Sequence, residues 1–471
     1  MAKRAKTAFF CSECGYETSR WLGRCPGCKA WNTMVETRTV TGEKKKEASG
    51  QHGWLADQLQ SEQGGRPVKP LDLAEVEEHE VDRISSGLGE FDRVLGGGFV
   101  PGSLVLVGGD PGIGKSTLLL QACAHNDFAG PTLYVCGEES PAQVKLRASR
   151  LELTGSGIKL YPEIIFERIS EVLLKLKPAF VVVDSIQTIY SEELTSAPGS
   201  VSQIRDVTAG FLRLAKGLGA TIVLVGHVTK DGAIAGPRVL EHMVDTVLYF
   251  EGEAHGGLRM VRGFKNRFGA TNELGIFEMT GKGLVPVENA SAALLSGRPV
   301  SVAGSAITAC LEGTRPILLE VQVLLNHTAY GVPQRMAQGL DRGRIAMLMA
   351  VLEKHAGLNF GDKDAFCNVI GGLKIDDPAA DLALAAAMAS AHRDVAIREG
   401  TLLLGEIGLT GELRPVAGAD RRLKEAARMG FSRCILPGSS RRGLGREAVQ
   451  TGVWPDLLYA DTLAEALDMA F

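Results

Sequence analysis

A glycine-rich stretch, GGDPGIGKST, carries the residue types that bind phosphate groups. It contains the pattern G-x-x-x-x-G-K-[ST] from Gly109 to Ser116, between the strand-like SLVLVG and the helix-like TLLLQACA. Such glycines let backbone N–H groups curl around phosphate oxygens, and the helix N-terminus adds a partial positive charge. A glycine-rich turn without a ligand is the alternative. The residues expected to bind ATP are Gly109, Asp110, Pro111, Gly112, Ile113, Gly114, Lys115, Ser116 and Thr117.

Hydrolysis of a bound nucleotide also needs a metal ion, an acid that orients it and a base for the attacking water. Lys115 is expected to reach the β- and γ-phosphates, and the Ser116 hydroxyl to ligate Mg²⁺. AFVVVD ends in Asp184, at the tip of a buried strand, where a carboxylate can face the Mg²⁺ shell. LYVCGEES offers Glu138 or Glu139 as the general base, and we favour Glu138. A solvated acid that caps the following helix is the alternative for Glu138.

His227 follows another strand-like run, in IVLVGHVTK. At a strand end near the phosphates, this side chain could sense the γ-phosphate. A structural histidine is the alternative.

Four cysteines are packed into residues 11–28, in CSECGYETSRWLGRCPGC. Cys11, Cys14, Cys25 and Cys28 form two C-x-x-C pairs, and each pair can make a knuckle whose two sulfurs point at one ion. Two such knuckles close a tetrahedral four-thiolate site, which predicts zinc, with an iron–sulfur cluster as the alternative. A site filled by four thiolates has no open coordination position, so its expected role is structural or in recognition.

A second cationic cluster lies 150 residues after Lys115, at the end of the strand-like LRMVRGF. It is the run Lys265, Asn266, Arg267, Phe268 and Gly269. Two cations and an aromatic ring suit phosphate or nucleic acid. A solvated hairpin tip with an anchoring phenylalanine is the alternative.

The composition is that of an ordinary globular protein, with 471 residues, 45% hydrophobic and 23% charged. The net charge of −4 conceals a mildly basic arm, because residues 1–68 hold eleven Lys/Arg against seven Asp/Glu. The sequence shows no signal peptide and no segment long enough to cross a bilayer, so we expect a cytoplasmic protein that does not engage membranes. Nine cysteines, four of them clustered, indicate reduced thiols with one metal site.

The elements that position these residues follow an α/β pattern. Short apolar runs alternate with helix-length segments from about residue 70 to 285, which predicts a mostly parallel sheet covered by helices. The predicted domains are a zinc knuckle (1–36), a flexible linker (37–68), a P-loop ATPase domain (69–285) and a C-terminal α+β domain (286–471). The alanine-rich AADLALAAAMASA in the last domain is predicted to be a buried helix.

These motifs together resemble the bacterial RadA (Sms) family of DNA repair ATPases. The resemblance rests on the cysteine knuckle, SSGLGEFDRVLGGG, GGDPGIGKST, VVVDSIQT, GHVTKDG and KNRFG in this order, and it covers essentially the whole chain. It implies a RecA-like core in a homo-oligomeric, hexameric ring that binds single-stranded and branched DNA, hydrolyses ATP and drives branch migration. The tethered knuckle has no catalytic position and is expected to recognise DNA or a recombinase or helicase protein, and the sequence leaves open which of these it contacts.

In RecA-like rings ATP lies between subunits, so the resemblance implies two roles for KNRFG. Lys265 and Arg267 are expected to reach a neighbour's phosphates or to contact DNA phosphates, with Phe268 stacking on a base. One loop could do both.

The C-terminal domain resembles the proteolytic domain of Lon, which uses a serine and a lysine. The matching positions here are Ala379, beside Ala380 and Asp381, and Asp420. A methyl group cannot attack a carbonyl, so we expect no peptidase activity and a scaffold for assembly and DNA contact instead. The candidate DNA contacts are Arg315, Arg335, Arg342 and Arg344. An ATP-dependent protease is therefore disfavoured, and a signalling ATPase of the KaiC type is the alternative function.

Overall fold

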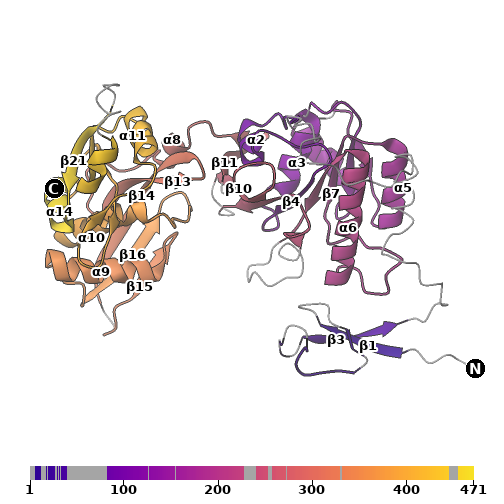
Figure 1. The fold of residues 1–471 in the computed structure, drawn as a ribbon, viewed down its shortest axis with the longest axis horizontal. Helices are drawn as coiled ribbons and strands as arrows, with labels where there is room; N and C mark the ends of the chain where they lie inside the picture. Colours follow the sequence, from indigo (N-terminus) through magenta and orange to yellow (C-terminus); the bar gives the residue numbers. More distant parts are fainter. Residues whose placement is uncertain are drawn as a thin grey trace, which may run out of the picture. The chain divides into compact units, whose positions relative to one another are not determined.

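The computed structural model divides the chain into two compact units, Met1–Pro286 and Val287–Phe471. The structure describes residues 6–11, 17–18, 20–26, 29, 31 and 33–39, and then residues 82–471 except 126, 154, 228–239, 253–256, 272, 329–330 and 445–453. Figure 1 shows the elements of both units. Within the described residues, no helix combines the length and hydrophobicity needed to cross a bilayer.

The N-terminal residues form a small antiparallel sheet with the strand order β2-β1-β3, drawn in indigo in Figure 1. Its strands are β1 (Lys6–Cys11), β2 (Glu17–Thr18) and β3 (Met34–Thr39). Cys11 at the end of β1 pairs with Met34 at the start of β3. Met34 and Cys25 are buried and Phe9 packs against them, and these three residues form the apolar cluster among the N-terminal side chains that the structure describes.

The core of the first unit is a nine-stranded sheet with the order β12-β11-β10-β9-β4-β8-β7-β5-β6. Six strands from β9 to β6 in this order are parallel, and β10 to β12 extend the sheet with antiparallel pairs. The prediction of a mostly parallel sheet is confirmed. The strands are β4 (Leu104–Gly108), β5 (Thr132–Cys136), β6 (Lys159–Tyr161), β7 (Phe180–Asp184), β8 (Thr221–Val225), β9 (Thr246–Glu251), β10 (Leu258–Asn266), β11 (Leu274–Thr280) and β12 (Gly283–Pro286).

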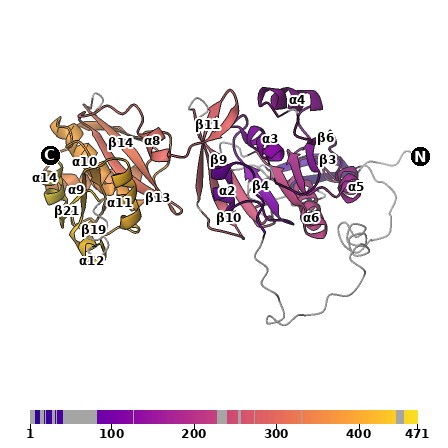
Figure 2. The same cartoon turned by 90° about the horizontal axis from the view of Figure 1, so that it is seen from above.

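Helices cover both faces of this sheet, which explains the unbroken apolar runs of its central strands. The helices are α2 (Gly89–Leu95), α3 (Lys115–His125), α4 (Pro141–Arg150), α5 (Phe166–Leu176) and α6 (Val201–Leu218). Val105 and Val107 of β4 belong to the core that includes residues of α2, α3 and α4. Leu104 and Leu106 belong to the opposite core, with residues of α5 and α6. Figure 2 shows α3 and α6 on opposite sides of β4.

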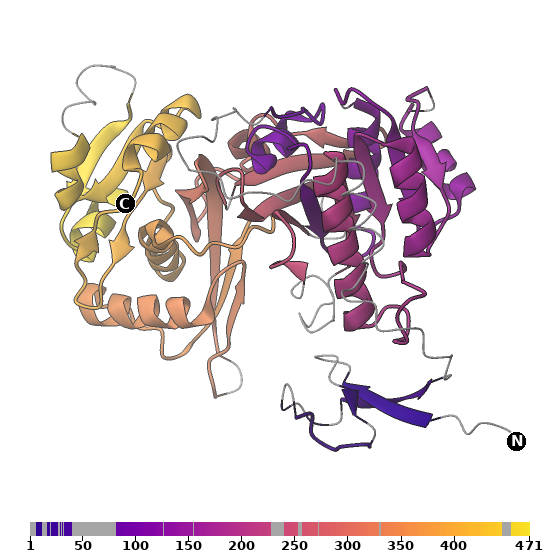
Figure 3. The same cartoon turned by 45° about the vertical axis from the view of Figure 1, so that its right-hand side comes forward.

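The second unit, orange to yellow in Figure 3, is built on a mixed seven-stranded sheet with the order β15-β16-β14-β13-β17-β20-β21. Its strands are β13 (Ser305–Glu312), β14 (Arg315–His327), β15 (Arg335–Gln338), β16 (Lys363–Val369), β17 (Thr401–Leu403), β20 (Arg433–Pro437) and β21 (Asp456–Ala460). A separate two-stranded sheet pairs β18 (Glu406–Ile407) with β19 (Leu413–Arg414).

The helices of this unit include the alanine-rich α10, and the prediction that it is buried is confirmed. All residues of α10 from Asp381 to Ser390 are buried, and the helix packs on β13 and β14. The helices are α8 (Ala290–Leu294), α9 (Arg342–Ala356), η2 (Pro378–Ala380), α10 (Asp381–Arg393), α11 (Ala419–Arg428), η3 (Gly438–Ser440), α12 (Arg441–Leu444) and α14 (Leu463–Ala470).

Candidate active site

The phosphate-binding loop connects the carboxyl end of β4 to the start of α3, and its curvature depends on glycine. Gly109, Gly112 and Gly114 have φ angles of 149°, 76° and 121°. A Cβ on Gly109 would lie 2.8 Å from the Cβ of Phe250, and one on Gly114 would lie 2.9 Å from Cε of Met279. Larger side chains would therefore push the loop away from β9 and β11, so the loop is shaped to present its backbone to a ligand.

Lys115, the first residue of α3, is 4% exposed and turns back into the loop. Its ammonium donates hydrogen bonds to the carbonyls of Gly109 at 2.7 Å and Asp110 at 2.8 Å. Burial lowers the pKa of Lys115, and the nearby charges of Asp184 and Glu138 oppose that shift. These carboxylates thus lie close to the ammonium that would meet phosphate.

Glu138 and His227 form a chain of polar contacts with Lys115. Nζ of Lys115 lies 3.3 Å from Nδ1 of His227, and Nε2 of His227 lies 3.0 and 3.1 Å from the two carboxylate oxygens of Glu138. Because an ammonium can only donate, Nδ1 accepts, and neutral His227 donates through Nε2 to Glu138. The Ser185 hydroxyl donates to Glu138 as well. The hydrogen bond from His227 is the main cause of a lowered pKa of Glu138.

Glu139 pairs with a helix residue, although it is next to Glu138 in the sequence. Its carboxylate forms an ion pair of 2.5 Å with Arg147 on α4. Neither Glu138 nor Glu139 caps α4. The N-cap is Ser140, whose side chain accepts from the backbone of Gln143 in a capping box. The structure therefore brings Glu138 to the phosphate loop and uses Glu139 to hold α4.

Asp184 ends β7 and is 7% exposed. The hydroxyl of Tyr134 donates to its Oδ2 at 2.5 Å. The oxygens of Asp184 and Ser116 are the hard donors that Mg²⁺ prefers, so the residues at this site fit a magnesium ion. They would hold it between the end of β7 and the start of α3.

Four residues of this site escaped the sequence reasoning. Tyr134 and Ser185 bind the two carboxylates, Gln187 donates to the His227 carbonyl at 3.4 Å, and the buried Arg259 of β10 donates to the Ile113 carbonyl of the loop at 3.1 Å. The position of Ser185 directly after the strand-ending Asp184 was a signal that could have been used. The other three depend on the order of strands in the sheet.

The KNRFG run lies at the end of β10, where a shift in register between Gly263 and Lys265 re-aims the strand. Lys265 donates to the carbonyls of Glu241 at 2.7 Å and Val244 at 2.8 Å, and burial together with the charge of Arg267 lowers the pKa of Lys265. It is thus held by its own chain.

The other KNRFG residues are divided between the interior and the surface. Asn266 is buried and donates to the Leu95 carbonyl at 3.0 Å. Arg267 has a 57% exposed side chain that pairs with Asp245 at 3.3 Å. Lys216 of α6 shares the same carboxylate at 3.1 Å and lies over the ring of Phe268 at 5.8 Å. Arg267 is therefore the accessible cation of the run.

KNRFG lies at the amino end of strand β4, and the phosphate loop lies at the carboxyl end of the same strand. Asp245, which pairs with Arg267, accepts from the backbone of Leu104 at the amino end of β4. The loop begins after Gly108 at the carboxyl end of the same strand. Five residues of strand span about 16 Å, so KNRFG is too far from the loop of its own chain to touch the same phosphates.

The predicted zinc ligands lie largely outside the described residues. Cys25 is described and buried, and Cys11 is the last residue of β1. Cys14, Cys28 and the side chain of Cys11 fall outside the part of the chain that the structure describes.

In the second unit, the elements that match the Lon catalytic pair lie side by side without catalytic side chains. Ala379 is fully buried in η2, and its backbone donates to Asp377, which pairs with Arg422 of α11 at 2.7 Å. Asp420 is the second residue of the same helix α11.

Asp381, which follows η2, is also engaged. Its carboxylate forms an ion pair with Arg344 and accepts from the backbone of Ile407 at 3.1 Å. Burial raises the pKa of Asp381, and the arginine opposes that shift. Arg344, predicted as a DNA contact, is thus used inside the fold, and Arg315 donates to the Glu288 carbonyl at 2.9 Å. Arg335 and Arg342 are exposed.

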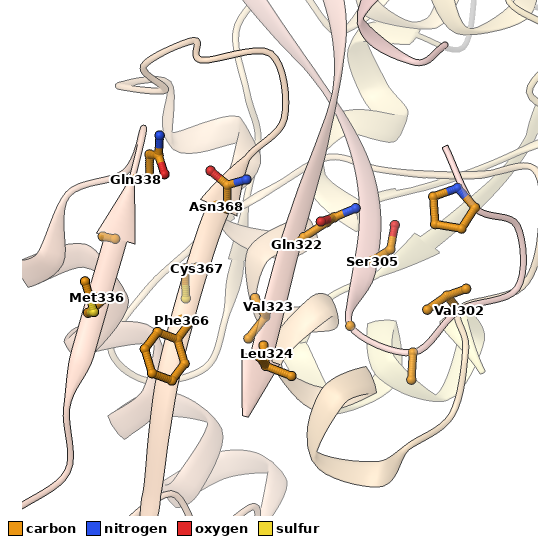
Figure 4. A pocket seen from close by; sticks show the side chains of 14 residues that line it. Val302, Ser305, Gln322, Val323, Leu324, Met336, Gln338, Phe366, Cys367 and Asn368 are labelled. Atoms are coloured by element: carbon orange, nitrogen blue, oxygen red, sulfur yellow. The ribbon is translucent and has the colours of Figure 1, made fainter. Parts of the chain in front are cut away.

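A separate groove of about 680 Å³ lies on the open face of β13 to β16. Figure 4 shows Gln338, Asn368 and Gln322 in a row across three strands, beside the apolar Met336 and Leu324. None of the described residues that line this groove is charged. It therefore lacks the cations that the phosphates of a nucleotide require.

Comparison with protein families finds matches in three parts of the chain. The families are described as "Rubredoxin metal binding domain" (residues 9–36), "AAA domain" (70–233) and "Subunit ChlI of Mg-chelatase" (341–440). The first agrees with the predicted N-terminal metal-binding knuckle, and the second contains the phosphate loop.

Curated relatives named "DNA repair protein RadA" match over nearly the whole chain. The relative from Bacillus subtilis is 51% identical over 94% of both chains. The relative from Halalkalibacterium halodurans is 48% identical over 100% of this chain and 99% of its own, and that from Pseudomonas aeruginosa is 48% identical over 100% of both. Among solved structures, a KaiC-like protein from Pyrococcus horikoshii covers 44% of this chain and 100% of its own, at 22% identity and a TM-score of 0.38.

Proposed function

This chain belongs to the RadA family of DNA repair proteins, and on that premise we propose that it is a DNA-dependent ATPase that processes branched recombination intermediates. The observation that carries the proposal is the convergence of Lys115, Glu138, Asp184 and His227 on one phosphate loop. These are the parts that nucleoside triphosphate hydrolysis requires. ATP is the substrate, and Mg²⁺ and Zn²⁺ are the proposed metals.

Lys115 performs the first step, which is binding of the triphosphate. Its ammonium leaves the carbonyls of Gly109 and Asp110 and pairs with the β- and γ-phosphates, while loop N–H groups bind the remaining oxygens. Ser116 and Asp184 would hold Mg²⁺, which would neutralise charge on the phosphates. The Lys115 ammonium loses two hydrogen bonds to neutral carbonyls in this step. Its pairing with charged phosphate oxygens offsets the loss, because hydrogen bonds between two charged groups are stronger.

Glu138 acts next, as the base that accepts a proton from the attacking water. Its lowered pKa keeps it ionised, so it is ready to accept. His227 connects this base to Lys115 through its two ring nitrogens. When Lys115 moves onto the phosphates, His227 loses a donor, which gives it the role of sensor that couples nucleotide binding to the position of Glu138.

Lys265 and Arg267 act between copies of the chain in this proposal. They are too far from their own loop, so a phosphate contact has to be made in a neighbouring subunit of a homo-oligomeric, hexameric ring. Arg267 is the better candidate because it is exposed, whereas Lys265 would have to leave two carbonyls. Contact with DNA phosphates is the second role that the same exposed surface allows.

The Arg267→Gln variant is expected to bind ATP normally and to lose DNA-stimulated turnover by about 10³-fold, the range of an arginine supplied by a neighbour. The measurement is phosphate release with single-stranded DNA, with Arg168→Gln on α5 as an exposed control. Mixing Arg267→Gln chains with Lys115→Ala chains should restore part of the turnover, since one kind has an intact loop and the other an intact arginine. If turnover did not recover in mixtures shown to co-assemble, action between copies would be contradicted. Contact with DNA would then remain as the role of Arg267.

The zinc site is proposed to be Cys11, Cys14, Cys25 and Cys28, within the part that matches a metal-binding domain. Closed four-thiolate sites fold small domains that cannot bury enough apolar surface alone. Its proposed role is recognition of DNA or of a recombinase or helicase.

Cys25→Ser should therefore release the metal. Elemental analysis of the purified full chain is expected to find about one zinc per chain in the wild type and in a Cys367→Ser control, and far less in Cys25→Ser. Equal zinc in all three proteins would refute the site.

A further inference from the structure

Tyr134 lies on β5, directly beside the strand that carries Asp184. Cys136 of β5 pairs with Asp184 of β7, so Tyr134 stands two residues earlier on the same face of the sheet. The ring is 1% exposed and packs in the core that includes residues of α2, α3 and α4. Its hydroxyl nevertheless reaches Oδ2 of Asp184 at 2.5 Å. The bond joins a residue of the hydrophobic core to the carboxylate at the phosphate site.

This bond makes the two oxygens of Asp184 inequivalent. A buried tyrosine hydroxyl needs a partner, and a hydrogen bond to a carboxylate is stronger than one between neutral groups. Because the Tyr134 ring is enclosed, its hydroxyl has a fixed position, and the Asp184 side chain has to rotate to meet it. Oδ2 is then occupied, and no described residue donates to Oδ1. The hydroxyl donates this bond, because an ionised carboxylate can only accept.

We propose that Tyr134 is a positioning residue that turns Oδ1 of Asp184 toward the magnesium ion bound with the nucleotide. Partners of this outer kind orient metal ligands, and their loss typically weakens metal affinity by 10–100-fold. The role belongs to the hydroxyl alone, because the ring itself is packed like its apolar neighbours. The inference rests on the proposed ATPase function, since it assigns Asp184 to the metal.

The test is Tyr134→Phe, which removes the hydroxyl and keeps the ring. Binding of a fluorescent ATP analogue is measured first in EDTA and then as Mg²⁺ is titrated. We expect metal-free binding to stay within about twofold of the wild type, because the Tyr134 hydroxyl bonds to Asp184 and not to the loop. The Mg²⁺ concentration for half-maximal enhancement of binding should rise about tenfold. Tyr161→Phe on the edge strand β6 is the control, and its Mg²⁺ dependence should be that of the wild type.

A double variant separates action through Asp184 from a general effect on the core. Asp184→Asn should itself raise the Mg²⁺ requirement, and adding Tyr134→Phe to it should change nothing further if the hydroxyl acts only by orienting the carboxylate. An unaltered Mg²⁺ dependence in Tyr134→Phe, or additive effects in the double variant, would overturn the proposal. The binding measurement needs no hydrolysis, so it can succeed even if the wild type proves to have no DNA-dependent turnover, and the two failures remain distinguishable.

Discussion

Lys115→Ala is expected to lose ATP hydrolysis by a factor of at least about 10³, because the phosphates lose the main cation of the loop. Nucleotide affinity should fall as well, since the ammonium meets the β- and γ-phosphates in the ground state too. The measurements are phosphate release and equilibrium binding of labelled ATP. Lys145→Ala removes an exposed lysine from α4 and should behave as the wild type.

The buried position of Lys115 calls for a check on folding. Its ammonium holds two carbonyls of the loop, so the alanine variant could loosen the loop as well as remove a charge. Thermal unfolding of Lys115→Ala and of the charge-keeping Lys115→Arg separates these effects. ATP hydrolysis that survived in a folded Lys115→Ala variant would show that the ATPase site has been assigned to the wrong residues.

Glu138→Gln is expected to lower the turnover number by about 10²–10⁴, the usual contribution of a positioned general base. An amide cannot accept the proton of the attacking water, yet it can still accept hydrogen bonds from His227 and Ser185. ATP binding should therefore stay within a fewfold of the wild type. The measurement is single-turnover hydrolysis together with ATP binding.

The adjacent acid supplies the control. Glu139→Gln breaks an ion pair with Arg147 on the side of α4 and should keep most of the turnover. Turnover lost in Glu139→Gln and kept in Glu138→Gln would exchange the two assignments. An equal loss of turnover in both variants would indicate damage to the turn after β5. Neither glutamate could then be assigned as the general base.

The fold of the first unit could be predicted because its information is local. Apolar runs such as SLVLVG and AFVVVD are buried on both faces, and no other environment suits them in a chain with helices between them. The antiparallel extension by β10 to β12 was not predicted, because a strand-length run such as LRMVRGF indicates a strand without indicating its direction in the sheet. Its antiparallel pairing with the preceding strand β9 is what distinguishes it.

Site residues that belong to a sequence motif could be predicted. Those that are brought together only by the order of strands in the sheet could not. The phosphate loop carries its function in its own spacing. The choice between Glu138 and Glu139 depends on the direction in which the chain turns after β5, and only Glu138 meets His227 and Ser185. Tyr134 reaches Asp184 because β5 lies beside β7, although the two residues are fifty positions apart.

KNRFG illustrates a motif whose location could be predicted and whose contacts could not. Its place at the end of a strand follows from the apolar run before it. The carbonyl partners of Lys265 belong to a segment more than twenty residues earlier in the chain, and a shift in register sets the direction of the side chain. Lys265 and Arg267 look equivalent in the sequence but differ in the structure. Lys265 is anchored to backbone carbonyls, and Arg267 is exposed.

Steady-state ATP hydrolysis by the wild type, measured with and without single-stranded DNA, tests the central claim most directly. Lys115→Ala run in parallel excludes a contaminating ATPase. We predict that DNA raises the wild-type rate severalfold and that the variant shows no activity in either condition. Wild-type hydrolysis that is the same with and without DNA would contradict a DNA-dependent motor and favour a signalling ATPase of the KaiC type.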